Sequence, residues 1–329
     1  MATVGVGMVH SWDVDQMPDC SGKTVVVTGA NSGLGFEATK VFVQHGATVI
    51  MACRSIERGK QAAYDIKEDL TEQAGGTLNV RQCDLASLDS VAEFATGVQE
   101  DYGELHILCN NAGVMAIPRG ETEDGFEMQL GVNHLGHFAL TGHLIELLVE
   151  TDGETRVVTH SSGAHTAGDL DFNDLHRTDS YGKWEAYGQS KLANLHFAYE
   201  LQRRLDEVGI SETKSVACHP GYADTNLQYR GPKEAGSRIR YALMKVANTA
   251  FGQPASQGAL PLLYAATGPD VVGGGYYGPG GFMNMRGRPE RQESNEDSHD
   301  EIDAEKLWAI SEAQTGVRFD FEALGSVTA

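Results

Sequence analysis

Cysteine is scarce in this sequence and poorly spaced for cross-linking. The chain of 329 residues contains five cysteines, none of them in a CxxC pair: Cys20, Cys53, Cys83, Cys109 and Cys218. An odd and scattered set argues against a disulfide framework and against a cysteine-based zinc site. Because free thiols persist in reducing surroundings, we expect a cytoplasmic protein whose cysteines act as small apolar side chains.

Long apolar runs and an N-terminal leader are also missing. Asp13, Asp15 and Asp19 interrupt the region where a signal peptide would carry a basic stretch followed by an apolar core. No apolar run approaches the roughly 20 residues that a membrane-spanning helix needs. The sequence therefore predicts neither secretion nor insertion into a membrane.

Basic residues are few compared with acidic ones. The chain has 25 Lys and Arg residues against 46 Asp and Glu residues, which gives a formal net charge of −21. Such a surface repels nucleic-acid phosphates and anionic membranes, so we expect neither as a partner. The plain interpretation is a soluble, self-repelling surface, and a sharper hypothesis is adaptation to a salt-rich cytoplasm.

Short β-branched runs alternate with amphipathic stretches along most of the chain. Hydrophobic residues make up 41% of the sequence, enough for a sizeable core. The pattern predicts strands at residues 24–28, 48–52, 78–82, 105–108, 156–159, 215–218 and 276–277. Helices are expected at residues 33–45, 88–102, 125–149, 183–208, 253–267 and 302–315, the last being the final helix. This alternation indicates a single α/β domain, a doubly wound Rossmann-type parallel sheet with helices on both faces.

The domain organisation follows from this pattern and its breaks. We expect residues 1–22 to form an N-terminal arm and residues 23–285 to form the α/β domain, including a substrate lid at about 225–253. Residues 286–329 are expected to pack on the same domain as an exposed polar loop, residues 286–301, followed by the C-terminal helix.

A glycine-rich turn joins the first strand to the first helix. It reads TGANSGLG from Thr28 to Gly35, with glycines at positions 29, 33 and 35 rather than in the GxGxxG spacing. Glycines allow a tight turn and close approach of a ligand, and the helix N-terminus beside them attracts a pyrophosphate. An ordinary strand-to-helix turn would look similar, but its place after the first strand of a βαβ unit favours nucleotide binding.

Two further motifs, in the right order, make a family resemblance plain. Asn110–Gly113 reads NNAG after the fourth expected strand, and Asp84–Leu85 follows the third. With TGANSGLG they resemble the motifs of the short-chain dehydrogenase/reductase family, over roughly residues 20–280. The resemblance implies a nicotinamide dinucleotide held by Gly29, Asn31, Ser32, Gly33, Leu34, Gly35, Asp84, Leu85, Asn111, Ala112 and Gly113.

The end of the second expected strand bears on which nicotinamide cofactor is used. Family members that prefer NAD carry an acidic residue there, whereas this chain has Cys53 followed by Arg54, with Arg58 one helical turn later. An acid would repel a 2′-phosphate, and an arginine can bind it with a fork of donors. We therefore expect NADP(H) in preference to NAD(H), although two solvated surface arginines would give the same pattern.

Tyr187 and Lys191 lie four residues apart in the segment YGQSK, and this spacing places both on one face of a helix. A nearby ammonium favours the phenolate and makes proton exchange feasible near neutral pH. The resemblance implies that Tyr187 is the general acid/base and that Lys191 lowers its pKa and binds the nicotinamide ribose. Tyr241 and Lys245 repeat the spacing, but they follow the sixth strand and are interpreted as structural.

The remaining catalytic assignments rest on the resemblance. The fifth expected strand ends in Ser161 and Ser162, and the family's pattern selects Ser162 as the group that polarises the substrate oxygen. Asn133 matches the family's helix asparagine, which would hold a water linking Lys191 to solvent. His134 and His137 are spaced three residues apart, but the sequence offers no convincing further ligand that would complete a metal site with them. We therefore expect them to have packing or surface roles.

After the sixth strand, Pro220 and Gly221 resemble the family's turn over the nicotinamide, and Thr225 lies where the family places a hydroxyl near the cofactor. The long segment between Ser162 and Tyr187 resembles the branch containing retinol dehydrogenases and light-dependent protochlorophyllide reductase.

Together these features predict a cytoplasmic NADP-dependent oxidoreductase, a carbonyl reductase or alcohol dehydrogenase, that acts on a small or apolar substrate. Two alternatives stay open, a C=C reductase and a non-catalytic NADP(H)-binding regulator. A homo-oligomer also remains open.

Overall fold

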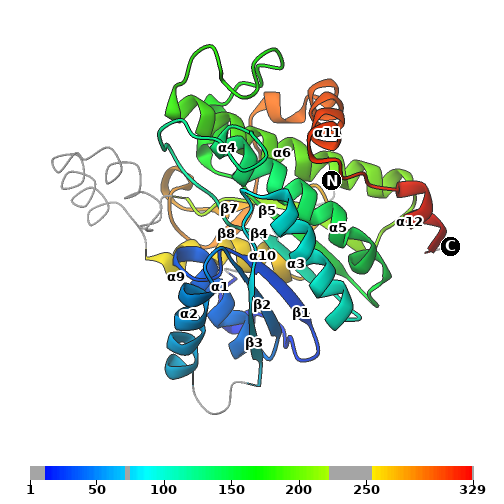
Figure 1. Ribbon diagram of the computed structural model, residues 1–329. Coiled ribbons are helices and arrows are strands. Elements are labelled where there is room, and N and C mark those ends of the chain that lie inside the picture. The colour runs from blue at the N-terminus through cyan, green and yellow to red at the C-terminus, as the bar shows by residue number, and fades with distance from the viewer. Residues whose placement is uncertain (1–11, 71–74, 222–253, 328–329) are drawn as a thin grey trace, which may run out of the picture.

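The computed structural model describes residues 12–70, 75–221 and 254–327. Within them one sheet of eight strands has the order β3-β2-β1-β4-β5-β6-β7-β8 (Figure 1). The strands are β1 (Thr24–Thr28), β2 (Thr48–Cys53), β3 (Thr77–Gln82), β4 (Ile107–Asn110), β5 (Thr155–His160), β6 (Thr213–Cys218), β7 (Tyr276–Pro279) and β8 (Pro289–Gln292). All neighbours pair in parallel except β7 and β8, which are antiparallel. The chain order reverses between β1 and β4, which is where ligands bind in such sheets.

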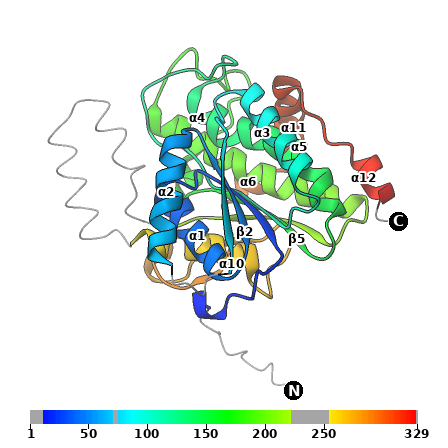
Figure 2. The same ribbon diagram turned by 60° about the horizontal axis from the view of Figure 1, so that its bottom comes forward.

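Helices cover both faces of the sheet (Figures 1 and 2). Helices α1 (Gly33–Gln44), α2 (Ile56–Asp69) and α10 (Leu260–Thr267) pack on one face, while α3 (Leu88–Asp101), α5 (Gly136–Glu150) and α6 (Lys183–Glu207) pack on the other. The central strands are buried on both sides, as continuous runs such as Val25–Val27 require, whereas the edge strands β3 and β8 are partly exposed. The predicted doubly wound Rossmann-type fold is therefore confirmed.

The remaining helices and helical turns complete the described chain. They are η1 (Val14–Gln16), α4 (Met128–Leu130), the π-helical turn η2 (Gly131–Leu135), η3 (Gly163–Ala167), α9 (Ala255–Gly258), η4 (Phe282–Asn284), η5 (Glu296–His299), α11 (Glu301–Thr315) and α12 (Phe321–Val327).

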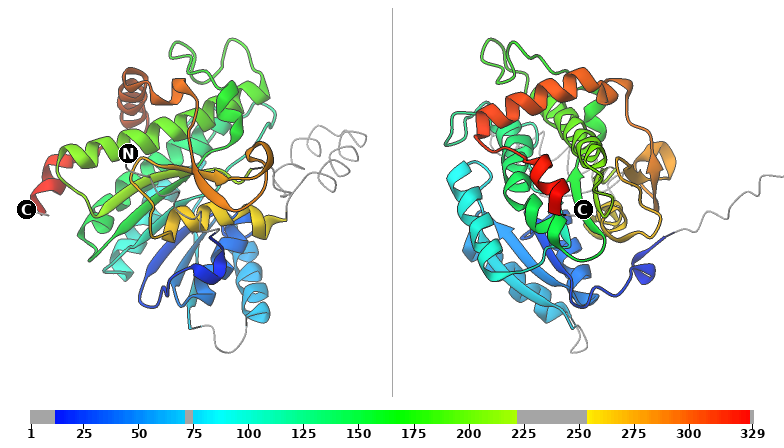
Figure 3. Two further views of the ribbon diagram at one scale, coloured as in Figure 1. Left: turned by 180° about the vertical axis from the view of Figure 1, so that it is seen from behind. Right: turned by 90° about the vertical axis from the view of Figure 1, so that its right-hand side faces the viewer.

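The two C-terminal helices lie across the outer side of α5 and α6 (Figure 3). Helix α11 starts where the Asp300 carboxylate accepts hydrogen bonds from the first backbone N–H groups, and it ends at Gly316 with φ +70°. Trp308 packs edge-on against Phe138, and its ring stacks on Phe197. These aromatic contacts attach the C-terminal segment to the main domain.

Several expected element boundaries were wrong. The helix predicted from residue 125 begins at Met128, because Gly125 adopts φ +83° in a turn and the Glu127 side chain caps the helix by accepting the Leu130 N–H. The fourth strand starts two residues later than predicted, at Ile107. Residues 286–301 are not entirely loop, since they contain β8, and α12 follows the helix expected to be last. An edge strand pairs on one side only, so its polar sequence PERQ carries no apolar pattern.

Candidate active site

The glycine-rich turn lies at the carboxyl end of β1, where Gly29 and Gly33 adopt φ +67° and +58°. These left-handed conformations favour glycine. At Gly35 a Cβ atom would lie 2.5 Å from the Asn111 amide nitrogen and 2.6 Å from the Gly29 carbonyl oxygen. Helix α1 therefore starts in close contact with its neighbours, and its N-terminus faces the end of the sheet.

Thr28 ties this turn to the NNAG segment after β4. Its hydroxyl oxygen accepts hydrogen bonds from the backbone N–H groups of Asn111 and Ala112, each at 2.9 Å. The Asn111 side-chain amide donates in return to the Thr28 carbonyl oxygen at 2.8 Å. The two loops that meet at the switch point of the sheet are thus held at a fixed spacing.

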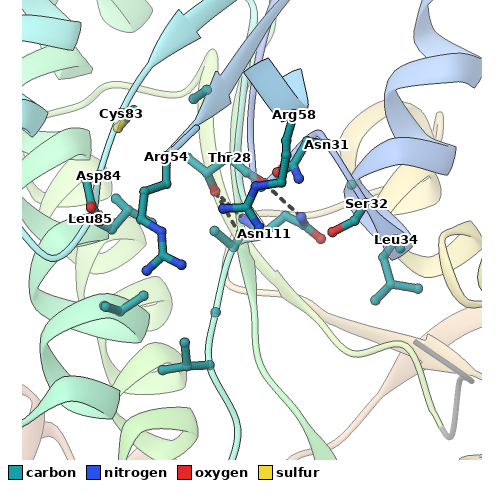
Figure 4. Close-up of a pocket in the computed structure, with 18 of the residues that line it drawn as sticks. Thr28, Asn31, Ser32, Leu34, Arg54, Arg58, Cys83, Asp84, Leu85 and Asn111 are labelled. Carbon is teal, nitrogen blue, oxygen red and sulfur yellow. Dashed lines mark hydrogen bonds between the residues drawn. The ribbon is translucent and has the colours of Figure 1, made fainter. Parts of the chain in front are cut away.

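A pocket opens over these loops (Figure 4). Its lining includes every predicted cofactor residue of the β1, β2, β3 and β4 ends: Gly29, Asn31, Ser32, Gly33, Leu34, Gly35, Arg54, Arg58, Asp84, Leu85, Asn111, Ala112 and Gly113. Sequence reasoning did not assign a cofactor contact to six further lining residues, namely Thr28, Ala52, Cys83, Val114, Met128 and Val132. These carry no chemical signal that would distinguish them from core residues.

The end of β2 carries no carboxylate. Cys53 is buried there, and burial raises the pKa of its thiol to about 11, so the side chain is uncharged. Arg54 and Arg58 are exposed and extend into the pocket in Figure 4. The Ser55 hydroxyl caps α2 by accepting the Arg58 N–H, so the cap fixes the turn that carries this arginine.

Tyr187 and Lys191 lie on one face of α6, as their spacing predicted. The Lys191 ammonium is 5.8 Å from the centre of the Tyr187 ring and donates a hydrogen bond to the His160 carbonyl oxygen at 2.9 Å. Burial lowers the pKa of Lys191 to about 8. Burial also raises the pKa of Tyr187 to about 12, although a hydrogen bond from the Ser162 hydroxyl acts in the opposite direction and lowers it. The expected lowering of the tyrosine pKa is therefore not met, because desolvation of the phenolate outweighs the favourable contacts.

The two serines at the end of β5 have different surroundings. Ser161 is 1% exposed, and its hydroxyl donates to the Lys191 carbonyl oxygen at 2.8 Å. Ser162 is only partly buried, lies beside Tyr187 and lines a second cavity. Of the two, Ser162 is the one hydrogen-bonded to the Tyr187 phenol, and its role toward a substrate stays a prediction.

Asn133 lies in the π-helical turn η2, an irregularity often found at functional sites. Its side-chain oxygen accepts the Val114 N–H at 2.8 Å, and its amide donates to the Val114 carbonyl oxygen and to the Ser190 hydroxyl. Both amide hydrogens are thus used to hold protein groups. The predicted role in holding a water stays a prediction.

Comparison with known proteins shows the family of this chain. The family model described as short chain dehydrogenase matches residues 23–235. This chain belongs to the short-chain dehydrogenase family. It is 40% identical to mouse (Mus musculus) retinol dehydrogenase 14, over 90% of this chain and 86% of that protein. Polyprenol dehydrogenase from the same organism is 41% identical, over 79% of this chain and 76% of the relative.

A solved structure has a similar fold over nearly the whole chain. An uncharacterized protein from Mycobacterium paratuberculosis is 39% identical and superposes with a TM-score of 0.75, covering 94% of this chain and 99% of that one. The predicted resemblance to the branch of retinol dehydrogenases is confirmed, and this dehydrogenase is an oxidoreductase. No helix within the described residues has the length and apolar character to cross a membrane.

A second cavity of this dehydrogenase, of about 510 Å³, lies beside Ser162. Gly221, predicted to lie over the nicotinamide, lines it and adopts φ +64°. Tyr276 forms another part of its lining, and the ring stacks on His219 at 5.1 Å between centroids. Sequence reasoning missed Tyr276, because two adjacent tyrosines in a glycine-rich segment predict a short strand and carry no functional signal.

The long segment between Ser162 and Tyr187 is anchored by a polar cluster that the sequence did not reveal. Gln129 accepts the N–H of Ala116, at 2.7 Å, and donates to the Tyr181 hydroxyl at 2.8 Å. Ala116 has φ +49°, a strained conformation for alanine that this hydrogen bond supports. The segment is thereby attached to the loop that continues from NNAG.

The predicted residues that follow β6 are only partly within the described residues. Pro220 follows β6 next to Gly221, whereas Thr225, the predicted lid at 225–253 and the pair Tyr241/Lys245 lie outside the described residues. Within the described ranges no group of three or more His, Cys, Asp and Glu residues could hold a metal ion.

Proposed function

We propose that this dehydrogenase is an NADP(H)-dependent carbonyl reductase or alcohol dehydrogenase, with Tyr187 as general acid/base. One observation carries the proposal. The buried Tyr187 phenol is hydrogen-bonded to Ser162, which lines the second cavity, and lies 5.8 Å from the Lys191 ammonium. That ammonium lies beside Gly113, which lines the pocket at the sheet's switch point. A dinucleotide in the first pocket and a substrate in the second would meet at this point.

The cofactor pocket fits a dinucleotide in its backbone and its charges. The left-handed turn at Gly29 and the close packing of Gly35 against it present the N-terminus of α1 to the pocket, where a pyrophosphate would bind. Arg54 and Arg58 supply cationic donors where a 2′-phosphate would lie, and uncharged Cys53 does not repel it. This combination favours NADP(H) over NAD(H).

Each catalytic side chain has a defined task in this proposal. When bound, the nicotinamide would supply a hydride to a carbonyl carbon or take it from an alcohol. With its pKa near 12, Tyr187 is protonated at neutral pH and can donate its phenolic proton to the carbonyl oxygen. The Ser162 hydroxyl holds that oxygen beside the phenol. Lys191, with its pKa near 8, supplies a positive charge for much of the neutral range and so favours departure of the proton.

The substrate is proposed to be an apolar alcohol or carbonyl compound. The names of the relatives, retinol dehydrogenase and polyprenol dehydrogenase, point to alcohols with long hydrocarbon chains. The cavity beside Ser162 has a mixed lining, in which Tyr276, Met283 and Met285 offer apolar contacts among polar side chains such as His219 and Gln292. A small polar substrate would leave most of this cavity unfilled.

The test is loss of NADPH absorbance with a panel of aldehydes and ketones of increasing chain length, repeated with NADH. We expect turnover with NADPH that falls by at least about 100-fold in Tyr187→Phe. Tyr64→Phe is the control, because Tyr64 is 58% exposed on α2 and lies outside both pockets. Binding of NADPH without turnover of any carbonyl compound would contradict the proposed reaction, and failure to bind either nucleotide would contradict the cofactor site.

A further inference from the structure

His137 connects the start of the glycine-rich turn to the π-helical turn η2. It is 1% exposed in the first turn of α5. Its Nε2 atom lies 2.9 Å from the Thr28 hydroxyl oxygen, and its Nδ1 atom lies 3.0 Å from the Asn133 carbonyl oxygen. One buried ring therefore contacts both the end of β1, from which the glycine-rich turn departs, and the π-helical turn that holds Asn133.

The partners favour one arrangement of protons. A carbonyl oxygen can only accept, so Nδ1 must carry the proton that it donates to Asn133. The Nε2 atom of a neutral ring then accepts. The Thr28 hydroxyl has two acceptors within reach, this nitrogen at 2.9 Å and the Cys109 carbonyl oxygen at 3.2 Å, and the shorter contact favours donation to the ring. This leaves the two lone pairs of the Thr28 oxygen for the N–H groups of Asn111 and Ala112, at 2.9 Å each. Every donor and acceptor in this chain of bonds is satisfied.

The ring keeps this arrangement over the whole range of working pH. Burial lowers the pKa of His137 to about 4, and the nearby Lys191 charge acts in the same direction. A second proton on the ring would turn Nε2 into a donor and leave the Thr28 hydroxyl only the longer contact to the Cys109 carbonyl oxygen, at 3.2 Å. The network therefore does not switch between pH 5 and 9 but stays fixed.

We propose that His137 is a positioning residue, which sets the glycine-rich turn, the NNAG segment and Asn133 in one fixed geometry through its Nδ1–H tautomer. The ring itself lines neither pocket and acts only through Thr28 and Asn133. Loss of the His137 contact leaves the Thr28 hydroxyl with the Cys109 carbonyl oxygen as its acceptor. The hydroxyl then turns, and its lone pairs move relative to the two N–H groups of the NNAG segment that they hold, which weakens dinucleotide binding. Loss of the Asn133 contact disturbs Val114 and Ser190, which Asn133 holds beside the catalytic residues.

Two amide substitutions separate these contacts. In His137→Gln the amide oxygen reaches the Nε2 position and can accept the Thr28 proton, whereas in His137→Asn the shorter amide reaches only the Asn133 carbonyl oxygen. His137→Leu removes both contacts. His134→Leu is the matched control, because His134 is also 1% exposed but bonds the Ser311 hydroxyl of α11, away from the cofactor loop.

Binding of NADPH, followed by its fluorescence, gives the first readout and needs no substrate. We expect the NADPH Kd to rise about tenfold in His137→Leu and His137→Asn and to stay within about twofold of wild type in His137→Gln and His134→Leu. Equal weakening in all four variants, in step with their melting temperatures, would show a merely structural role and overturn the proposal.

The second readout is the 15N NMR spectrum of the histidine rings, with the His137 signal assigned by its disappearance in the variants. We expect an Nδ1–H tautomer that is unchanged between pH 5 and 9, and an Nε2–H tautomer would overturn the proposal. The inference rests on the proposed cofactor site, but different measurements would contradict the proposed cofactor site and the role of His137. If wild type bound neither nucleotide, the proposed function would fall, and the tautomer would still decide the network.

Discussion

Replacement of Arg54 and Arg58 by alanine tests the cofactor preference most directly. Both side chains are exposed and reach into the pocket at the end of β2 (Figure 4). If they hold the 2′-phosphate of NADP(H), their removal weakens NADPH binding and leaves NADH binding unchanged, because NADH has no phosphate there. The ratio of the two Kd values therefore isolates the arginine contribution from any general disturbance of the pocket.

The expected magnitude follows from the exposure of the two guanidinium groups. A hydrogen bond to a charged group contributes about 1.5–3 kcal/mol when well shielded from solvent. Solvent screening at this exposed site reduces the contribution to roughly 1–2 kcal/mol for each arginine. Each single variant should thus raise the NADPH Kd by about 5- to 30-fold. The double variant should show less than the product, because both side chains share one phosphate.

Fluorescence titration with NADPH and NADH, at low salt and at 1 M KCl, measures these effects. Lys60→Ala is the control, since Lys60 is an exposed cation on the same helix α2 that does not line the pocket. The advantage of NADPH over NADH should also shrink at high salt in wild type. Equal weakening of NADPH and NADH in the arginine variants, or an effect of Lys60→Ala of the same size, would refute the reasoning.

Three further substitutions give distinct outcomes. Lys191→Met should abolish turnover yet raise the free energy of unfolding at pH 7 by up to ~3 kcal/mol, because burial lowers the Lys191 pKa from its ordinary 10.5 to about 8. In denaturant titrations this gain should be full below pH 8 and vanish toward pH 10.5, and a destabilised variant would contradict it. Ser162→Ala should lower kcat about 100-fold with an unchanged NADPH Kd, and a rise in Kd alone would count against its role. Trp308→Ala should cost roughly 3–5 kcal/mol of unfolding free energy, since the indole packs against Phe138 and Phe197, whereas a cost below about 1 kcal/mol would show that α11 is loosely attached.

Much of the candidate site was predictable from local spacing. The pair Tyr187 and Lys191 shares a helix face because four residues make about one helical turn, and this holds in any tertiary context. Gly29 and Gly35 are similarly local, since a turn between strand and helix needs them. Such motifs report chemistry through a few neighbouring residues, so one sequence suffices to find them.

Contacts between distant segments could not be predicted in this way. The bond between Gln129 and Tyr181 spans 52 positions, and that between His137 and Thr28 spans 109. Neither residue type in these pairs is unusual where it stands. The sequence therefore predicted packing for His137, while the structure shows both ring nitrogens engaged with groups of the site.

The sequence by itself determined the α/β class, the position of the cofactor loop and the Tyr-Lys pair, because strand and helix periodicity and turn chemistry act over a few residues. Only the tertiary structure decided the antiparallel strand β8, the covering of α5 and α6 by α11 and α12, and the protonation of Tyr187. The pKa of that tyrosine depends on how completely its phenol is removed from water, and burial is a property of the assembled fold.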